Sequence, residues 1–257
     1  MKKKPFVLSV IVTILATVVV SCEKDVNYGY SITMTTEASD VTFLVGAKMY
    51  NKIEIDWGDG IIEKYTPDIF NKKLKRENLG TSPKTITITG LVTSLICGTN
   101  QLTNLDVSKN TGLVTLGCGN NQLTNLDVSK NAALDHFLCL RNQLTNLDVS
   151  KNTELSELNC SNNQLTNLDV SKNTGLVTLG CGNNQLTNLD VSKNTGLVTL
   201  GCDNNQLTTA ALNDLFDTLP GDPGSITYLS IFIGKNPGTN TCDRSIAENK
   251  RWHIFDN

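Results

Sequence analysis

The stretch QLTNLDVSKNTGLVTLGCGNN, residues 101–121, decides the fold because the chain repeats it every 21 residues. Related units begin at Gln122, Gln143, Gln164 and Gln185. The unit at Gln164 is identical to the first, and the unit at Gln185 differs from it only at Asp203. Such a fixed period is typical of a solenoid, in which each repeat forms one turn and contacts only its neighbours.

Each unit contains two copies of one apolar pattern, seen in LVTLGCGNN at 113–121 and LTNLDVSKN at 123–131. Both match the leucine-rich-repeat core L-x-x-L-x-L-x-x-N, with cysteine or valine at the third apolar position. Residues 91–208 therefore resemble the short 21-residue bacterial leucine-rich repeats with two alternating halves. The resemblance implies a mainly β chain, a leucine-rich-repeat β-solenoid with two short parallel strands per turn and no helix inside the repeat.

The segment before the repeats, residues 29–90, is expected to form a β module that caps the solenoid. Its alternating runs predict the strands Tyr30–Thr36, Val41–Gly46, Lys52–Trp57, Ile61–Tyr65 and Lys84–Thr89. The sequence IDWGDG at 55–60 resembles the W-G-D-G turn of PKD-type immunoglobulin-like modules. In such a turn the two glycines supply the backbone conformation and Asp59 bonds its own backbone. The module is therefore expected to be immunoglobulin-like and PKD-like.

The segment after the repeats, residues 209–257, is expected to form a C-terminal α/β cap. Thr209–Leu219 predicts a helix that ends before Pro220. A strand over Ile226–Ile233 and a short helix over Asp243–Arg251 are expected to follow, ahead of Trp252–Phe255.

The first 21 residues have the parts of a lipoprotein signal peptide. Lys2–Lys4 is a positive start, and Phe6–Val20 is an apolar run too short to span a bilayer comfortably. The tetrapeptide ending at Cys22, Val-Val-Ser-Cys, resembles a lipobox. The resemblance implies cleavage after residue 21, lipid attachment at Cys22 and a linker over residues 22–28. An ordinary secretory signal with a chance cysteine is the alternative.

The location and the partners are expected to follow from the anchor and the charge. Glu23-Lys24-Asp25 resembles the acidic tags of Bacteroidetes surface lipoproteins, which implies an outer membrane lipoprotein on the cell surface. The formal net charge is −3 and becomes more negative once the three leader lysines are removed. Nucleic acid is therefore not expected as a partner, because its binding needs a concentrated basic face. The short basic cluster Lys72–Arg76 is expected to be a solvated loop.

Columns of identical residues follow from the period. The cysteine column is expected to hold free, buried thiols, because ladder side chains point the same way and cannot converge tetrahedrally on zinc. It comprises Cys97, Cys118, Cys139, Cys160, Cys181 and Cys202, whereas the state of Cys242 is left open. Stacked asparagines are expected to bond turn backbone, as in Asn121, Asn142, Asn163 and Asn184. An aspartate column from Asp106 to Asp190 is expected to be a solvated face balanced by lysines rather than a calcium site.

The sequence differences between units indicate where a ligand could bind. QLTNLDVSKN is unchanged in all five units, so most variation falls in the other half. The variable outward positions predict a binding face made of Asp135, His136, Leu138, Leu140, Arg141, Glu157 and Asn159. Period-two alternation places both leucines outside, where they could anchor a partner. Ordinary surface scatter and contact with a terminal domain are the alternatives.

These features favour a non-catalytic cell-envelope binding protein that recognises a protein or glycan ligand. The two histidines, His136 and His253, have no local nucleophile or carboxylate that suggests a catalytic triad. No metal or cofactor is expected, the membrane is reached through the lipid anchor, and the chain is expected to be a monomer. The alternative is a structural spacer on the cell surface with no ligand of its own.

Overall fold

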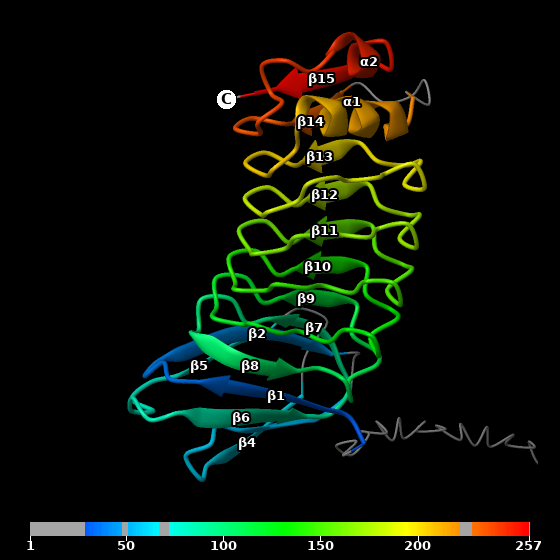
Figure 1. The fold of residues 1–257 in the computed structure, drawn as a ribbon. Helices are drawn as coiled ribbons and strands as arrows, with labels where there is room; N and C mark the ends of the chain where they lie inside the picture. Colours follow the sequence, from blue (N-terminus) through cyan, green and yellow to red (C-terminus); the bar gives the residue numbers. More distant parts are fainter. Residues whose placement is uncertain (1–28, 48–50, 67–71, 222–227, 257) are drawn as a thin grey trace, which may run out of the picture.

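Stacked turns form the body of the molecule, with a β module at one end and an α/β cap at the other (Figure 1). The computed structural model describes residues 29–47, 51–66, 72–221 and 228–256. The expected leader and linker at 1–28, including Cys22, lie outside the described residues. Among the residues that are described, no helix combines the length and the apolarity that a membrane span requires.

Each turn of the solenoid contributes one three-residue strand to a parallel ladder. The strands are β9 (Thr115–Gly117), β10 (His136–Leu138), β11 (Glu157–Asn159), β12 (Thr178–Gly180) and β13 (Thr199–Gly201). Neighbours pair at the 21-residue spacing, so Leu116, Phe137 and Leu158 stack directly. The central residue of each strand is fully buried, and the residues on either side point outward.

The second strand expected in each turn forms only once, so that prediction is wrong for one half of the repeat. β8 (Leu102–Asp106) exists because it pairs antiparallel with β1 (Ser31–Thr36) of the N-terminal module. In later turns, side chains bond the backbone groups that a strand would offer its neighbour. The Leu123 amide donates to Asn142 Oδ1 at 3.0 Å. Such bonds compete with a sheet ladder.

The two halves of a turn are therefore held differently. We call QLTNLDVSKN and its equivalents the bracketed half, because side chains form hydrogen bonds to its backbone. LVTLGCGNN and its equivalents are the strand half, because backbone hydrogen bonds join it to its neighbours. At the start of each bracketed half, one direct backbone hydrogen bond links successive turns, such as the bond from the Gln143 amide to the Leu123 carbonyl at 2.8 Å.

The N-terminal module consists of two sheets packed against each other. The first has the order β4-β3-β6-β1-β8 and adds β3 (Ile53–Asp56), β4 (Ile62–Tyr65) and β6 (Lys84–Thr89). The second is the far end of the solenoid ladder, where β7 (Val92–Ile96) is followed by β2 (Val41–Ala47) and β5 (Lys72–Arg76). Phe43 and Trp57 meet between the sheets with ring centroids 5.3 Å apart. All five predicted strands are present.

The basic cluster Lys72–Arg76 is the edge strand β5, so the prediction of a solvated loop is wrong. Its Leu74 is buried between the exposed Lys73 and Lys75, which is the alternation of a half-buried strand. Val41 pairs with Arg76 across the antiparallel ladder. Lysines on an edge strand discourage pairing with another chain, which explains a basic composition that otherwise indicates a loop.

The W-G-D-G turn has the conformation expected from its sequence. Gly58 and Gly60 have φ angles of 73° and 85°, and a Cβ at Gly58 would lie 2.6 Å from the Thr85 carbonyl oxygen. Asp59 Oδ1 accepts the Ile61 amide at 3.0 Å, as predicted, and its other oxygen pairs with Arg76 at 2.6 Å. The turn thereby joins the first sheet to β5.

The C-terminal cap closes the other end of the ladder. It contains α1 (Thr209–Thr218), β14 (Leu229–Phe232), α2 (Ser245–Glu248) and β15 (Trp252–Phe255). Both strands continue the parallel ladder beyond β13. Trp252 is buried and donates its Nε1–H to the Pro220 carbonyl at 2.8 Å. The first two residues of the expected strand, 226 and 227, lie outside the described residues.

Candidate binding site

The outward side chains of the ladder β9–β13, with the residues that follow each strand, form a surface that we call the strand face. Its second and third turns carry all seven residues expected to bind a ligand. In the ladder, His136 lies beside Glu157, and Leu138 lies beside Asn159. The structure thus brings residues that are 21 positions apart in sequence into direct contact.

The two leucines of the strand face are half-buried, not exposed as the alternation suggested. An added Cβ at Gly119 would lie 2.8 Å from the Leu140 side chain, so Leu140 covers the preceding turn. Leu138 is flanked by Gly117 on one side and Asn159 on the other. Leu140 therefore fills the space over Gly119, whereas Ile96 of the preceding turn lies nearest to Gly117. Part of each leucine remains open to solvent.

Arg141 occupies a backbone conformation that suits asparagine better. Its φ is 53°, and the same position of the other turns has φ between 49° and 62°. Four of those turns use Asn120, Asn162, Asn183 and Asn204, and the partial turn before them uses Thr99. Asparagine adopts left-handed backbone more readily than arginine does, so the second turn keeps a long cation at a locally unfavourable position.

The polar residues at the start of β10 form a small surface network. His136 Nδ1 lies 3.2 Å from Asp135 Oδ2. Asp135 Oδ1 accepts a hydrogen bond from the Ser156 hydroxyl of the next turn. Because the imidazole and the carboxylate are each about half exposed, this network offers hydrogen-bonding groups to a partner and contributes little to folding.

Asparagine columns bracket the turns, which accounts for their repetition. Asn163 Oδ1 accepts the Leu144 amide at 3.0 Å, while its Nδ2 donates to the carbonyls of Cys139 and Cys160 at 3.1 and 3.0 Å. One side chain thus joins two turns. The equivalent residues Asn121, Asn142 and Asn184 make the same bonds. These buried amides are structural.

The cysteine column is an inward row of the strand half. All six thiols are free and fully buried: Cys97, Cys118, Cys139, Cys160, Cys181 and Cys202. Burial raises the pKa of Cys97 and of Cys160 to about 12, so these thiols stay protonated near neutral pH. Cys242 is also free and only partly buried. The described residues contain no group of three or more histidine, cysteine or acidic side chains arranged to hold a metal ion.

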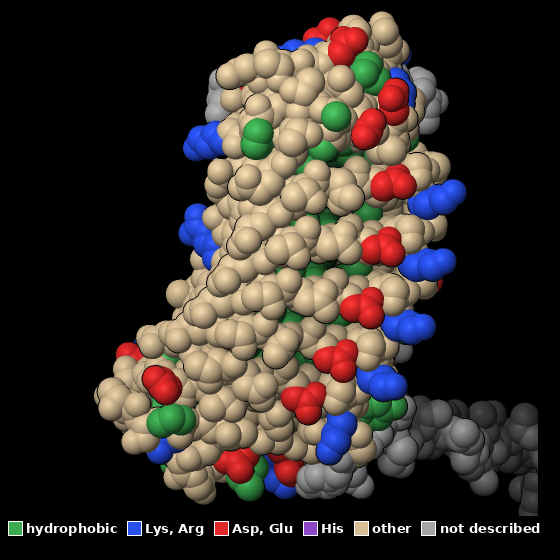
Figure 2. All heavy atoms as spheres, in the orientation of Figure 1, with side chains coloured by type: hydrophobic (Ala, Val, Ile, Leu, Met, Phe, Trp, Pro, Cys, Tyr) green, Lys and Arg blue, Asp and Glu red, His purple; other side chains and the backbone are tan. Residues whose placement is uncertain are grey.

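The aspartate column lies on the bracketed half and faces solvent. Figure 2 shows rows of acidic and basic side chains running side by side up the solenoid. Each aspartate also caps its own turn: the Ser129 amide donates to Asp127 Oδ1 at 2.8 Å. This bond, with the Ser129 hydroxyl, holds the pKa of Asp127 below 3.8. The column therefore combines a solvated charge with a structural hydrogen bond.

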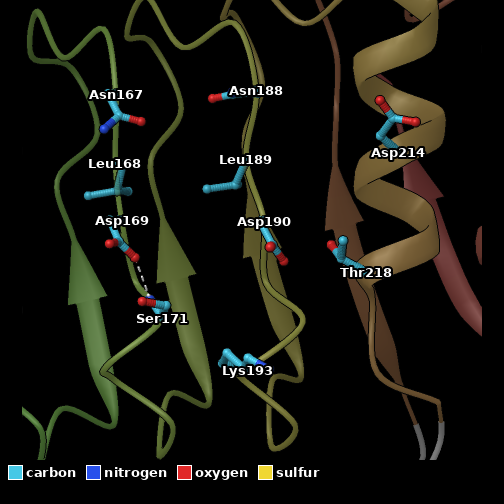
Figure 3. Close-up of a pocket in the computed structure, with 10 residues that line it drawn as sticks. All are labelled: Asn167, Leu168, Asp169, Ser171, Asn188, Leu189, Asp190, Lys193, Asp214 and Thr218. Atoms are coloured by element: carbon cyan, nitrogen blue, oxygen red, sulfur yellow. Dashed lines mark hydrogen bonds between the residues drawn. The ribbon is translucent and has the colours of Figure 1, made fainter.

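A shallow groove of about 480 Å³ lies where the bracketed half meets α1. Figure 3 shows Leu168 and Leu189 on neighbouring turns, with Asp214 on the helix opposite them. The Val191 amide donates to Thr218 Oγ1 at 3.2 Å, which fixes α1 against the last complete turn. Apart from Asp214 and Thr218 of α1, the groove is lined by residues that every unit shares, so it follows from the repeat geometry and the position of the cap.

A group of exposed aromatic rings at the capped end of the strand face was not predicted from the sequence. Phe232 of β14 stacks on Phe255 of β15 with ring centroids 4.8 Å apart and planes 18° apart. The Tyr228 ring lies 5.8 Å from the His253 ring, with the two planes tilted by 46°. The alternating pattern around β14 could have indicated outward rings, but nothing in the sequence pairs β14 with β15.

Comparisons with known proteins agree with this architecture. The repeats resemble those of an internalin. The functional domain of InlJ from Listeria monocytogenes, described as including a cysteine ladder, aligns with 41% sequence identity and a TM-score of 0.50, over 61% of this chain and 37% of that one. An internalin of the same species, InlF, aligns with 21% identity and a TM-score of 0.50, over 63% of this chain and 46% of that one.

A leucine-rich-repeat protein of Leptospira interrogans also aligns, with 22% identity and a TM-score of 0.48, over 63% of this chain and 48% of that one. The chain thus spans less than half the length of these three proteins. No family model and no curated protein matches it. The fold is that of a bacterial leucine-rich-repeat solenoid, a class that presents an extended surface for binding.

Proposed function

We propose that the chain is a non-catalytic cell-envelope binding protein that recognises a protein ligand through the second and third turns of its strand face. One observation carries the proposal: the outward residues change in these two turns, while the bracketed half stays constant. Their changes bring two half-buried leucines, an arginine and two acidic residues together on neighbouring strands. Apolar anchors surrounded by polar groups are typical of a protein interface.

Arg141 supports the same conclusion independently. Its left-handed conformation disfavours arginine relative to asparagine, which four other turns use. Local departures from the residue that best fits the backbone tend to occur at functional sites. Arginine is also enriched among the residues that dominate binding energy. The cation is therefore expected to contact the partner.

The test exchanges the face of the second turn for that of the third. The variant Leu138→Asn/Leu140→Ser/Arg141→Asn installs residues that the chain itself holds at these positions, namely Asn159, Ser161 and Asn162. Wild type and variant, as residues 23–257, are screened against panels of extracellular proteins and glycans. The proposal expects protein binders that the variant loses, whereas a binder retained in full by the variant would place recognition elsewhere. Binding to glycans alone would exclude a protein ligand.

A structural spacer is the second candidate function, and the near-identical first, fourth and fifth units favour it. A spacer depends on length and not on surface chemistry. Deleting residues 164–184 removes one complete unit and joins like sequence to like sequence. If the native role is spacing, the deletion impairs it and the surface exchange does not; the recognition proposal expects the opposite.

The lipid anchor remains a proposal that rests on the leader sequence. Cys22 would carry the acyl chains, and the acidic residues that follow would direct the protein to the outer surface of a Bacteroidetes-type outer membrane. Metabolic labelling with a palmitate analogue should label the wild-type chain and not Cys22→Ser, and protease added to whole cells should remove it. The PKD-like character of residues 29–90 and a monomeric state are further proposals, the latter testable by light scattering.

A further inference from the structure

Gly201 leaves a bare patch on the strand face near the cap. A Cβ added there would meet only backbone atoms, Gly180 Cα at 3.9 Å and the Leu179 carbonyl oxygen at 4.0 Å. The neighbouring Gly180 is different, since the Asn159 side chain and the Ser161 hydroxyl lie 3.1 and 3.2 Å from its Cβ position. The surface over Gly201 is therefore open, and the Asn159 side chain bounds it on one side.

An aromatic ring bounds the other side of the patch. Gly201 pairs with Phe232 in the parallel ladder, and Phe232 pairs with Phe255 beyond it. The centroid separation of 4.8 Å equals the usual distance between strands, about 4.8 Å. Phe255 therefore covers one face of the Phe232 ring, and Gly201 lies on the opposite side of Phe232 in the ladder. The free face of Phe232 is thus turned toward the open space above Gly201.

A carboxylate lies beside the same patch. Asp203 follows Gly201 by two residues, so its side chain leaves the same face of the strand. It leans over Gly182 of the preceding turn, where Asn183 Nδ2 donates to Asp203 Oδ2 at 3.3 Å. No ion pair joins Asp203 to a basic side chain anywhere in the described part of the chain. Its charge therefore remains available to a partner.

Asp203 is also the single residue that separates the fifth unit from the first and fourth. Those units hold Gly119 and Gly182 at this position. The one change in an otherwise identical repeat thus introduces a negative charge next to an open glycine and an exposed ring.

We propose that Gly201, Phe232 and Asp203 form a receptor for one arginine side chain of a protein partner. The guanidinium would stack on the free face of Phe232 above Gly201 while its N–H groups bond the Asp203 carboxylate. Arginine fits because it is planar, always charged and weakly hydrated, stacks on aromatic rings and matches a carboxylate with two parallel donors. The proposal rests on the proposed protein-recognition function and names the chemistry of part of the partner.

The test measures binding of small probes to the mature chain by amide chemical-shift changes. Nα-acetyl-arginine methylamide is compared with its citrulline counterpart, which has a similar shape without the charge, and with methyl glucoside. The arginine probe is expected to shift the signals of Gly201, Asp203 and Phe232 with a dissociation constant in roughly the millimolar range. Citrulline should shift them far less.

Three variants decide the assignment. Asp203→Gly restores the residue of the identical units and should weaken arginine binding about two- to fivefold, the effect of one exposed ion pair. Gly201→Leu copies Leu138 at the equivalent strand position and should abolish binding by filling the space. Asp190→Asn removes the same charge from the opposite side of the turn and should change nothing.

Several results would overturn the receptor. Equal shifts with citrulline, arginine shifts centred on other residues, or no saturable shift at the solubility limit of the probe would each do so. Shifts at these residues with methyl glucoside and not with arginine would replace the proposal by a carbohydrate site. If Gly201→Leu fails to fold, Asp203→Gly still decides. Since no natural partner is involved, failure here leaves the face of the second and third turns untouched.

Discussion

The two halves of each turn are under opposite constraints. The backbone of the bracketed half is bonded by its own aspartates and by the buried asparagine that ends each strand half, so replacing one of these side chains removes structural bonds. In the strand half, backbone groups bond each other along the ladder, which any residue except proline allows. The bracketed half is invariant over five units, whereas the outward positions of the strand half vary. A solenoid of this kind can therefore change its surface chemistry where the backbone supplies the stability.

The largest expected effect concerns the cysteine column of the strand half, whose thiols should be inaccessible to water in the native state. Alkylation of native protein by iodoacetamide near pH 8 should modify Cys242, and the six column thiols should react at least about a thousandfold more slowly, because they require unfolding. Burial also raises the pKa of thiols such as Cys160, to about 12, which suppresses the reactive thiolate. Peptide mass spectrometry over time measures each rate, and denatured protein is the control.

Removing one bracket should have the largest effect on stability. Asn163→Ala leaves the Leu144 amide without its side-chain partner and removes one of the two asparagine donors from each of the Cys139 and Cys160 carbonyls. At about 1–3 kcal/mol for the unpaired amide and about 0.5–1.5 kcal/mol for each of the other two lost bonds, the free energy of unfolding should fall by at least about 2 kcal/mol, measured in urea. Asn167→Ala, at an exposed position of the following turn, is the matched control and should stay within about 0.5 kcal/mol of wild type. Equal effects of the two changes would contradict the bracket.

Acid should weaken the bracketed half through its aspartates. Bonds from the Ser150 amide and hydroxyl hold the pKa of Asp148 below 3.8, and the other four column aspartates are lowered for the same reason. A carboxyl whose pKa is lower in the folded state stabilises the fold above 3.8 and loses that contribution as pH falls through the folded value. The melting temperature should therefore decrease as the pH is lowered below about 4.

The matched variant for this prediction is Asp148→Asn, which retains an acceptor for the Ser150 amide without a titrating group. Its melting temperature should depend less steeply on pH between about pH 4 and pH 2. An unchanged pH profile would show that the carboxylate bonds do not contribute to acid stability.

The sequence predicted the solenoid because its period is a property of the chain and each apolar column recurs in register. It also predicted α1 and the five strands of the N-terminal module, where alternation and turn residues are local signals. It failed for the bracketed half, because L-x-x-L-x-L describes burial and does not say whether backbone or side chains carry the hydrogen bonds. It failed for β5 because lysine composition outweighed the single buried Leu74.

The candidate site was predictable in position and not in detail. Comparing units identified the variable turns, but alternation alone could not show that Leu140 would cover Gly119. The left-handed backbone at Arg141 was equally invisible without the pattern of the other turns in three dimensions. The receptor proposed at Gly201 depends on the pairing of β13 with β14 across a segment that does not repeat, which no periodicity specifies.

The most direct test of the comparison uses no ligand. It compares the urea unfolding of two variants. Leu138→Asn/Leu140→Ser/Arg141→Asn changes three residues on the strand face, whereas Asn163→Ala removes one asparagine of the column that bonds the turns. We expect the triple variant to lose less than about 2 kcal/mol, since it removes two half-buried leucines and gives a left-handed position its preferred asparagine. A loss as large as that of Asn163→Ala would show that the strand face is not free to vary.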